Sequence, residues 1–521
     1  MDPNWTGVHP WYEVDVALER TAEKESPTMP IDLRTHDRLA RELLSSHYLL
    51  IGDERLSQTT APRFEHVNPA TGRVQADVVM AGIDEVDRAV VSAEKAQKVW
   101  WSWRPDERRN ALFRLAALVR GDGEDMSRIL MLEAGIPISM AAGLPRRGGD
   151  YLEYYAGYAD KIEGQVIPIF PEQAFDYTLP EPYGVVAAIS TWNGGVSSLC
   201  RKGGAALAAG NAVVVKDMEL APFSAVRFGE LALQAGLPPG LVNVIVGGPE
   251  AGAALVGHPK VSKVSFTGGV ETARRILATA AESITPVVLE LGGKSGSIVF
   301  PDADLETAGR FSGMTPMGLA GQACVSPSRL IVHESVHDRV LEVAVETARA
   351  LPLGDPLDPA TVIGPVVSES QYHRILGMIA RAEQSPSGHL VTGGAAVSGD
   401  LGAGFFIEPT IFDGLASEDY IAQEEVFGPV VSVLTFSDED EAIALANDTQ
   451  YGLAGYVHTS NLQRAHRVAA ALDAGYISIN GFAALPASAP FGGHKLSGIG
   501  KEGGRAGLDE FLRSKNVYIP L

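Results

Sequence analysis

From Gly184 onward, short and continuous apolar runs alternate with helical stretches, and this alternation constrains the fold more than any other feature of the sequence. The apolar runs lie at residues 184–190, 212–216, 242–246, 261–266 and 286–291. The helical stretches between them lie at residues 198–209, 223–235, 250–256 and 270–281. Strands that are apolar throughout and separated by helices predict a parallel sheet with crossover connections. Such sheets bind nucleotides at the carboxyl ends of their strands.

A second α/β region follows, and a helical region precedes the first sheet. Further strands are expected at residues 295–300, 329–333, 430–436, 454–458 and 476–480, with helices at 337–350 and 439–447. Apolar residues at helical spacing predict two earlier helices, 83–99 and 105–120, with Asp84 and Asp106 as their N-terminal caps. The last run, 515–519, is typical of an edge strand that pairs within the chain or across a subunit interface.

Residues 1 to about 45 are expected to form an N-terminal extension. Its aromatic residues, Trp5, Trp11 and Tyr12, indicate that part of it packs against another surface. A short helix is expected within residues 36–47, and regular structure is expected to begin near His47.

Charge and composition exclude some classes of function. The chain has 42 Lys and Arg against 64 Asp and Glu, a net charge of −22 spread over 521 residues. Such a surface repels nucleic acid and anionic lipid. There are only two cysteines, no basic and apolar leader, and no apolar run of about 20 residues, so we expect a cytoplasmic protein without a membrane span. The length predicts two or three domains.

Two residues have the chemistry of a nucleophile and a general base. Cys324 follows Gly-Gln-Ala, and a cysteine nucleophile must be partly exposed with a depressed pKa. Glu290 ends an apolar run and precedes a Leu-Gly-Gly sequence, and partial burial would raise its pKa and suit it to general-base work. Each residue alone has a plainer interpretation, a buried thiol for Cys324 and a helix or turn cap for Glu290.

Polar residues after other strands indicate an oxyanion site and a cofactor site. Asn193 could donate its amide to an oxyanion, or form an ordinary Asn-Gly turn. Lys216 and Glu219 follow the next strand, where such a pair either holds ribose hydroxyls or stands in a solvated loop. Residues 266–269, Phe-Thr-Gly-Gly, open a helix whose backbone N–H groups can approach a pyrophosphate, although the fingerprint GxGxxG is absent.

Two short motifs are decoys. Residues 333–337 spell HExxH, the zinc-protease signature, but 329–333 is predicted to be a strand and Ser335 a helix cap, so the two histidines should not converge. Residues 292–295 are similar to a phosphate-binding loop, but the first glycine of that motif would fall at Val288. We therefore predict no metal site. Cys200, in a helical stretch, is expected to be a structural thiol.

Each signal is modest, but their order along the chain closely resembles the aldehyde dehydrogenase superfamily. The order is Asn193, Lys216 with Glu219, Gly268 with Gly269, Glu290, Cys324, and then residues 424–429, Glu-Glu-Val-Phe-Gly-Pro. Residues 68–72, 289–295 and 490–493 support it. The resemblance runs from about His47 to the C-terminus, about nine-tenths of the chain.

The resemblance implies an α/β fold in three parts. A cofactor-binding domain with a variant Rossmann sheet would comprise residues 46–163 and 183–292, and a catalytic domain residues 293–496. Residues 164–182 and 497–521 would form an oligomerisation arm and a C-terminal strand, and the arm would pair with the C-terminal strand of a partner subunit. Family members of this type are homodimers or homotetramers.

The resemblance also implies roles for single residues. Cys324 would attack the aldehyde, Asn193 and the Cys324 backbone N–H would hold the oxyanion, and Glu290 would activate water to hydrolyse the thioester and could also deprotonate Cys324. Lys202 matches a lysine near the catalytic base. Glu219 favours NAD over NADP, because a carboxylate repels a 2′-phosphate. The remaining cofactor contacts would come from Ser190, Thr191, Trp192, Lys216, Gly248, Gly252, Phe266, Thr267, Gly268, Gly269, Leu291, Gly292, Glu425 and Phe427.

The chain departs from the family pattern around the predicted substrate site. The family has Pro before Trp-Asn and Phe-Pro after it, where this chain has Thr191, Gly194 and Gly195. Gly194 and Gly318 match positions that often hold aromatic walls, so we predict a wide apolar channel and a bulky hydrophobic substrate such as an aromatic, terpenoid or long-chain aldehyde. The predicted pocket residues are Gly194, Ser198, Gly318, Ala323, Val325, Leu485 and Phe491.

Two other functions remain as alternatives. A CoA-acylating dehydrogenase would pass the acyl group to CoA rather than to water, but such enzymes generally lack the base at the Glu290 position. A catalytically silent member of the family would serve as a structural or binding protein, and the unusual loop after Thr191 is the feature that favours it.

Overall fold

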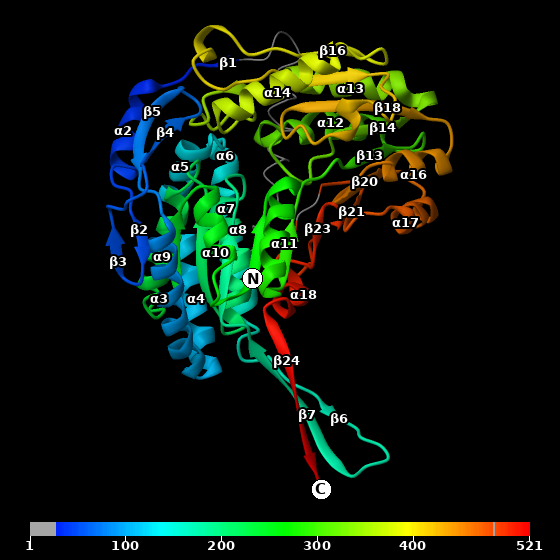
Figure 1. The fold of residues 1–521 in the computed structure, drawn as a ribbon. Helices are drawn as coiled ribbons and strands as arrows, with labels where there is room; N and C mark the ends of the chain where they lie inside the picture. Colours follow the sequence, from blue (N-terminus) through cyan, green and yellow to red (C-terminus); the bar gives the residue numbers. More distant parts are fainter. Residues whose placement is uncertain (1–27, 483–484) are drawn as a thin grey trace, which may run out of the picture.

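The computed structural model describes residues 28–482 and 485–521. Two α/β lobes lie side by side, and a narrow arm projects below them with the C-terminus at its tip (Figure 1). The expected packing of Trp5, Trp11 and Tyr12 lies outside the described residues.

The first lobe is built on an eight-stranded sheet in the order β23-β12-β11-β8-β9-β10-β2-β3. Its central strands are β8 (Val185–Ile189), β9 (Ala212–Asp217), β10 (Val242–Val246), β11 (Val261–Thr267) and β12 (Val287–Glu290). These five strands are mutually parallel, which confirms the predicted sheet. The sheet is extended by antiparallel strands that were not predicted, β2 (Leu49–Ile51), β3 (Glu54–Leu56) and β23 (Gly498–Ile499).

Helices cover both faces of this sheet (Figure 1). The helices that contact its strands are α3 (Ile83–Ser102), α8 (Gly195–Ala208), α9 (Phe223–Gln234), α10 (Pro249–Val256) and α11 (Val270–Ser283). Helices α4 (Pro105–Gly121), α5 (Gly123–Ala134) and α7 (Gly143–Ala156) pack on these helices and on one another. The predicted caps Asp84 and Asp106 are wrong. Both lie inside the first turn, where a carboxylate favours the positive end of the helix dipole without capping it.

Regular structure begins earlier than expected. Strand β1 (Thr28–Met29) pairs with β15 (Leu353–Gly354), and α2 (Leu33–Leu43) places the predicted short helix a few residues before 36–47. Leu39 and Leu44 are buried in the core, and His36 Nε2 lies 2.8 Å from Asp355 Oδ1. This part of the chain is therefore packed on the main body.

The second lobe contains a seven-stranded sheet in the order β16-β17-β18-β14-β13-β20-β21. Its strands are β13 (Gly296–Val299), β14 (Arg329–His333), β16 (His389–Thr392), β17 (Thr410–Asp413), β18 (Val430–Phe436), β20 (Ala454–His458) and β21 (Tyr476–Ile479). Its helices are α12 (Leu305–Met314), α13 (His337–Ala350), α14 (Glu369–Ala382), α16 (Glu439–Asn447) and α17 (Leu462–Ala471). The five predicted strands and both predicted helices are present, whereas strands β16 and β17 at one edge and helices α12, α14 and α17 were not located from the sequence.

The arm consists of β6 (Val166–Ile167), β7 (Ala174–Pro182) and β24 (Leu512–Pro520). The expected pairing of the arm with a partner's C-terminal strand is wrong, because β24 pairs antiparallel with β7 of the same chain from Leu512↔Pro182 to Pro520↔Ala174. The short helix α18 (Gly504–Asp509) delivers β24 to the base of β7. No other strand of the described residues pairs with the outer edges of β6 and β24.

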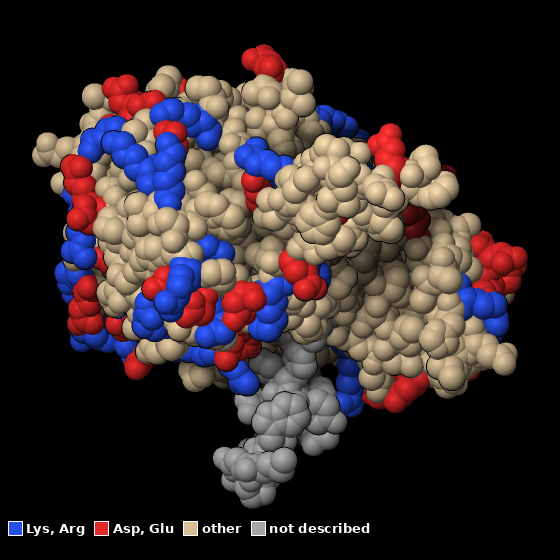
Figure 2. Space-filling model, turned by 90° about the horizontal axis from the view of Figure 1, so that it is seen from below, with Lys and Arg blue, Asp and Glu red and all other residues tan. Residues whose placement is uncertain are grey.

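The exposed surface of the arm is rich in apolar side chains. They include Val166, Phe170, Phe175, Leu179, Tyr518, Ile519 and Leu521. The view from below mixes both signs of charge over one side of the face and has a broad area with few charges on the other (Figure 2). Within the described parts of the chain, no helix is both long and apolar enough to cross a membrane.

Candidate active site

Cys324 lies in a tightly turned loop between the 3-10 helix Thr315–Gly321 and β14. Leu319, Ala320 and Gly321 have φ angles of 54°, 52° and 72°, so three consecutive left-handed residues turn the chain. A Cβ on Gly321 would overlap the carbonyl of Gly428, which leaves room only for glycine. The turn leaves the Cys324 side chain half-buried.

Glu290 approaches the same loop from β12. The chain that follows passes so close to it that a Cβ on Gly293 would lie 2.5 Å from the Cys324 carbonyl oxygen. The Glu290 side chain is buried, and its Oε1 atom has no hydrogen-bond partner in the described part of the chain. Burial, followed by the charge of Glu502, raises the pKa of Glu290 to about 8. The sequence analysis predicted that burial raises the pKa of Glu290, and the direction of the shift agrees with it.

The Cys324 thiol does not have the depressed pKa that was expected for a nucleophile. Burial and the charge of Glu290 raise the pKa of Cys324 to about 12, and the charge of Arg201 opposes this shift only in part. That expectation is therefore wrong, because burial destabilises the thiolate more than the single nearby cation stabilises it. Formation of the thiolate needs a group that accepts the proton.

Asn193 reaches the Cys324 loop from the turn between β8 and α8. Its Nδ2 atom donates to the Gln322 carbonyl at 2.9 Å, and its Oδ1 atom accepts from Thr191 Oγ1 at 2.7 Å. Gln322 is itself fixed by Val367 N, which donates to its Oε1 atom at 3.0 Å. These bonds fix the orientation of the Asn193 amide and hold it against the Gln322 carbonyl, two residues before Cys324 in the chain.

Close packing explains why two glycines follow Asn193. Gly195 has a φ of 43°, and a Cβ there would clash with Leu130. A Cβ on Gly194 would lie 2.7 Å from the Ser198 Cβ, so Ser198 fills the space beside Gly194. The loop thus packs closely against its own helix and α5.

Lys202 lies in a buried cluster of charges near Glu290. Its Nζ atom donates to Ser265 Oγ at 3.1 Å and to a carboxylate oxygen of Glu502. The other oxygen of Glu502 forms an ion pair with Arg201, whose Nε atom lies 2.7 Å away. Burial lowers the pKa of Lys202, and the charges of both Lys202 and Glu502 act on Glu290. Sequence reasoning predicted Lys202 but missed Glu502 and Arg201, because no local pattern marks either residue.

Most of the predicted cofactor residues meet at the carboxyl ends of the parallel strands. The sheet register puts Phe266 and Thr267 beside Leu289 and Glu290, and Ser190 follows the neighbouring strand. Lys216 is buried at the end of β9, with Glu219 half-buried just after it.

Glu425 and Phe427 close the other side of this region. Glu425 Oε1 accepts from Gly293 N at 3.0 Å, and a Cβ on Gly292 would overlap the Glu425 carboxylate. The rings of Phe427 and Trp192 meet edge to face, with centroids 5.6 Å apart. Two predicted groups that are far apart in the sequence are therefore in contact.

The region has free polar atoms and open space that fit a dinucleotide. The buried atoms Trp192 Nε1 and Thr267 Oγ1 lack hydrogen-bond partners among residues 28–482 and 485–521. An added Cβ on Gly248, Gly252 or Gly269 would meet nothing within 4 Å. Gly248 and Gly269 precede α10 and α11, whose first turns have no side-chain cap, so their N–H groups can approach phosphates.

The comparison of this chain with known families decides its membership. The sequence pattern of the aldehyde dehydrogenase family matches residues 56–517. The chain belongs to the aldehyde dehydrogenase family.

Solved structures of other aldehyde dehydrogenases are similar over nearly the whole chain. The NAD-dependent enzyme from Sinorhizobium meliloti is 35% identical with a TM-score of 0.90, covering 94% of this chain and 97% of its own. An NAD+ complex of the enzyme from Bacillus cereus is 36% identical with a TM-score of 0.90, covering 96% and 100%. The indole-3-acetaldehyde dehydrogenase AldA of P. syringae, in complex with NAD+ and IAA, is 37% identical with a TM-score of 0.90, covering 93% and 99%.

Several predicted pocket residues of this aldehyde dehydrogenase pack together beside Cys324. Val325 and Phe491 are buried in one cluster, and Leu485 packs against it with the Cys324 side chain. Tyr456 Oη donates to the Val325 carbonyl at 2.8 Å and holds this wall in place. Gly318 is buried in the turn before Ala323.

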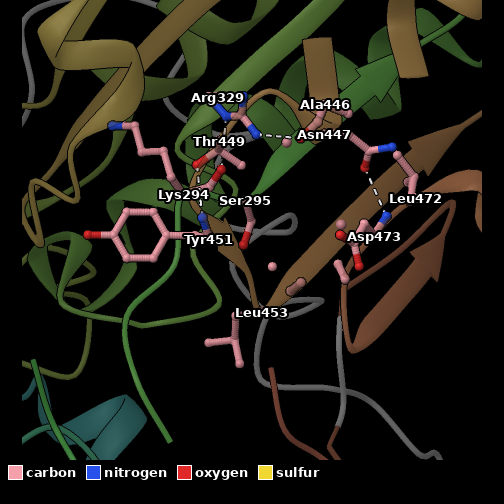
Figure 3. A pocket seen from close by; sticks show the side chains of 15 residues that line it. Lys294, Ser295, Arg329, Ala446, Asn447, Thr449, Tyr451, Leu453, Leu472 and Asp473 are labelled. Atoms are coloured by element: carbon pink, nitrogen blue, oxygen red, sulfur yellow. Dashed lines mark hydrogen bonds between the residues drawn. The ribbon is translucent and has the colours of Figure 1, made fainter. Parts of the chain in front are cut away.

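A separate hollow lies at the start of the second sheet (Figure 3). It is bordered by Lys294, Arg329 and Asp473, and the Arg329 guanidinium donates to the carbonyls of Lys294 and Ala446 at 2.8 and 2.7 Å. Lys294 Nζ is buried and has no hydrogen-bond partner among the described residues, and burial lowers the pKa of Lys294 to about 7.

The HExxH histidines belong to different elements, as predicted. His333 ends β14 and accepts from Ser335 N at 3.1 Å, while His337 opens α13 and lies 2.8 Å from Asp413. Ser335 itself lies in a 3-10 turn that His333 caps, so its predicted capping role is wrong. Within the described ranges, no group of three or more His, Cys, Asp or Glu side chains is placed to hold a metal ion. Cys200 is fully buried in α8.

Proposed function

We propose that this enzyme oxidises an aldehyde to the carboxylic acid with NAD+, through a thioester on Cys324 that is hydrolysed by water activated by Glu290. The observation that carries the proposal is the close approach of Gly293, three residues after Glu290, to the Cys324 carbonyl, with a buried carboxyl oxygen of Glu290 left without a partner in the described part of the chain. Similar structures with the same fold are described as NAD-dependent or contain NAD+, which supports the choice of cofactor.

The first chemical step is attack by Cys324 sulfur on the carbonyl carbon. Since the pKa of Cys324 is raised to about 12, the thiol must lose its proton as it reacts, and the Glu290 carboxylate is the proposed acceptor. The negative charge moves to the aldehyde oxygen. The Asn193 amide has a second hydrogen beyond its bond to Gln322, and with the Cys324 backbone N–H it would hold that oxygen.

Bound NAD+ supplies the hydride acceptor for this adduct. The nicotinamide end would be held by Trp192, Phe427 and Glu425. The adenosine ribose would be held by Lys216 and Glu219. The phosphates and the adenine would lie at the helix starts after Gly248 and Gly269. The half-buried Glu219 carboxylate would repel a 2′-phosphate, so NAD is the preferred cofactor and NADP the weaker one.

Hydrolysis of the thioester then depends on the ionised form of Glu290. Its carboxylate takes a proton from water, and the oxygen adds to the thioester carbon and releases Cys324. Lys202 and Glu502 are positioning residues in this step, since they form a buried ion pair whose charges set the protonation of Glu290. The presence of this base favours hydrolysis over transfer to CoA.

The substrate and the assembly follow from the surroundings of the site. The glycines at 194 and 318, with the apolar wall of Val325, Leu485 and Phe491, support a bulky and largely apolar aldehyde, although Ser198 fills the space beside Gly194. The open edges and apolar side chains of the arm support a homodimer or homotetramer. The proposed division into domains is residues 46–163 with 183–292, then 293–496, with the arm formed by 164–182 and 497–521.

A panel of aldehydes with NAD+ and NADP+ tests the proposal through the absorbance of the reduced nicotinamide. We expect benzaldehyde and longer aldehydes to be oxidised with NAD+, with a higher kcat/KM than acetaldehyde. Turnover that requires CoA would show the acylating alternative to be correct. No reduction of either cofactor by any aldehyde would support the catalytically silent alternative.

A further inference from the structure

Arg201 lies on the face of α8 that carries two predicted pocket residues. Gly194 precedes the helix, and Ser198 and Arg201 follow it by four and seven residues, a spacing that places all three on one side. The Arg201 guanidinium carbon is 5.4 Å from the ring centroid of Phe491, another pocket residue. Arg201 was not part of the predicted site, because a single arginine in a helical stretch carries no local signal.

The other contacts of Arg201 also belong to the substrate side of the site. Its guanidinium lies 5.8 Å from the ring centroid of Tyr151, and Tyr151 Oη donates to the Leu485 carbonyl at 3.0 Å. Burial dominates the raised pKa of Cys324, but the charge of Arg201 lowers it, which places this cation within electrostatic reach of the nucleophile. Arg201 therefore lies between the pocket wall and the reacting sulfur.

The Arg201 guanidinium has hydrogen-bond donors that no described residue uses. Of its five N–H groups, Nε faces Glu502 at 2.7 Å, and no hydrogen bond joins Nη1 or Nη2 to another residue among 28–482 and 485–521. The Arg201 side chain is 13% exposed, whereas that of Glu502 is 3% exposed. Glu502 thus orients the guanidinium from one side and leaves its two terminal nitrogens free.

The buried charges near Arg201 do not balance. Arg201 and Lys202 share the single carboxylate of Glu502. Burial raises the pKa of Glu290, which reduces its negative charge near neutral pH, and burial lowers the pKa of Lys202. Two basic side chains therefore share one carboxylate in a largely dry site, and the unbonded terminal nitrogens of Arg201 favour an anionic ligand.

We propose that Arg201 determines specificity by binding a carboxylate on the substrate, which makes the substrate a semialdehyde of an organic acid. The carboxylate would accept two hydrogen bonds from Nη1 and Nη2 in the fork geometry that guanidinium and carboxylate share. The part of the substrate between its two polar ends would contact Phe491 and Leu485, which agrees with a bulky, apolar skeleton. This inference rests on the proposed oxidation of an aldehyde at Cys324 and names the class of that aldehyde.

Three related substrates test the inference without any change to the enzyme. They are 4-formylbenzoate, its methyl ester, which keeps the shape but lacks the charge, and benzaldehyde. Hydrogen bonds to a charged group predict that kcat/KM for 4-formylbenzoate exceeds that for the ester by about 10- to 100-fold. An ester that is oxidised as well as the acid overturns the inference. If none of the three is oxidised, the proposed function itself fails.

A matched set of variants assigns the effect to Arg201. Arg201→Met should lose about 10- to 100-fold in kcat/KM for 4-formylbenzoate, mainly through KM, and much less for benzaldehyde. Arg201→Lys should recover part of the loss. The control is Arg505→Met, since Arg505 also lies over a tyrosine ring, Tyr158 at 5.7 Å, but is exposed on α18. Equal losses on both aldehydes in Arg201→Met would show a structural role and refute the proposal.

Discussion

Glutamine at position 290 keeps the shape of the buried side chain but cannot take up a proton. Burial, with the charge of Glu502, raises the pKa of Glu290 to about 8. Only the ionised carboxylate acts as a base, and its fraction rises from about 1% at about pH 6 to about half at about pH 8. We therefore expect wild-type kcat to rise roughly 50-fold over this interval. In Glu290→Gln the rise should vanish, and kcat at about pH 8 should fall by about 10²- to 10⁴-fold.

The same substitution has a predicted effect on stability. The pKa of Glu290 is raised in the fold from 4.5 to about 8, so the folded chain holds a proton that the unfolded chain releases. The contribution of this carboxyl to the free energy of unfolding is fully present below pH 4.5 and is lost as the pH rises through about 8. The loss amounts to about 5 kcal/mol at most. Because glutamine does not titrate, Glu290→Gln should be more stable than wild type above about pH 8.

Two measurements check this reasoning. Initial rates of cofactor reduction across the pH range give the kinetic profile, and urea unfolding at about pH 5 and about pH 8 gives the stability difference. Glu282→Gln serves as the control, because Glu282 is an exposed residue on α11 and should change neither quantity. A wild-type kcat that stays flat from about pH 6 to about pH 8, or a Glu290→Gln enzyme with full turnover, would falsify the assignment of Glu290 as the base.

Three further predictions concern single residues. Cys324→Ala should abolish cofactor reduction with every aldehyde, whereas Cys200→Ala, at a fully buried thiol in α8, should keep the activity of the wild type in the same assay. Gly195→Ala should lower the free energy of unfolding by about 1–3 kcal/mol, since Gly195 has a φ of 43° and no room for a Cβ. Gly377→Ala, at an exposed position of α14 with open space for a Cβ, should raise it by about 0.5–1 kcal/mol in the same urea titration. Glu219→Gln should raise kcat/KM for NADP+ relative to NAD+ by about tenfold, and an unchanged ratio would remove Glu219 from the cofactor preference.

The sequence was sufficient for the elements that repeat a local pattern. The five strands of the first parallel sheet are apolar throughout, and each was located within one or two residues. Burial on both faces makes such runs visible without any knowledge of their neighbours. The two strands missed in the second lobe, β16 and β17, lie at one edge of its sheet and have four residues each. No residue of β16 is fully buried, so its sequence has less reason to be apolar, and β17 is buried but too short to show a clear pattern.

Errors arose where an outcome depended on a partner far away in the chain. Helix α2 could not be recognised as part of the body, because its place depends on His36 meeting Asp355, 319 residues later. The pairing of β24 with β7 within one chain likewise depends on where α18 leaves the C-terminal segment. The depressed pKa expected for Cys324 failed because desolvation is a property of the packed site.

By itself, the sequence determined the alternation of strands and helices, the family, and the order of Asn193, Glu290 and Cys324 along the chain. Residue type and spacing fix these features, and they can be read locally. Only the tertiary structure brought Glu502 between Arg201 and Lys202, about 300 positions away, by pairing β23 with β12 beside Glu290. Charge balance and the protonation of buried groups are decided by which side chains share a dry space, and no local pattern specifies that.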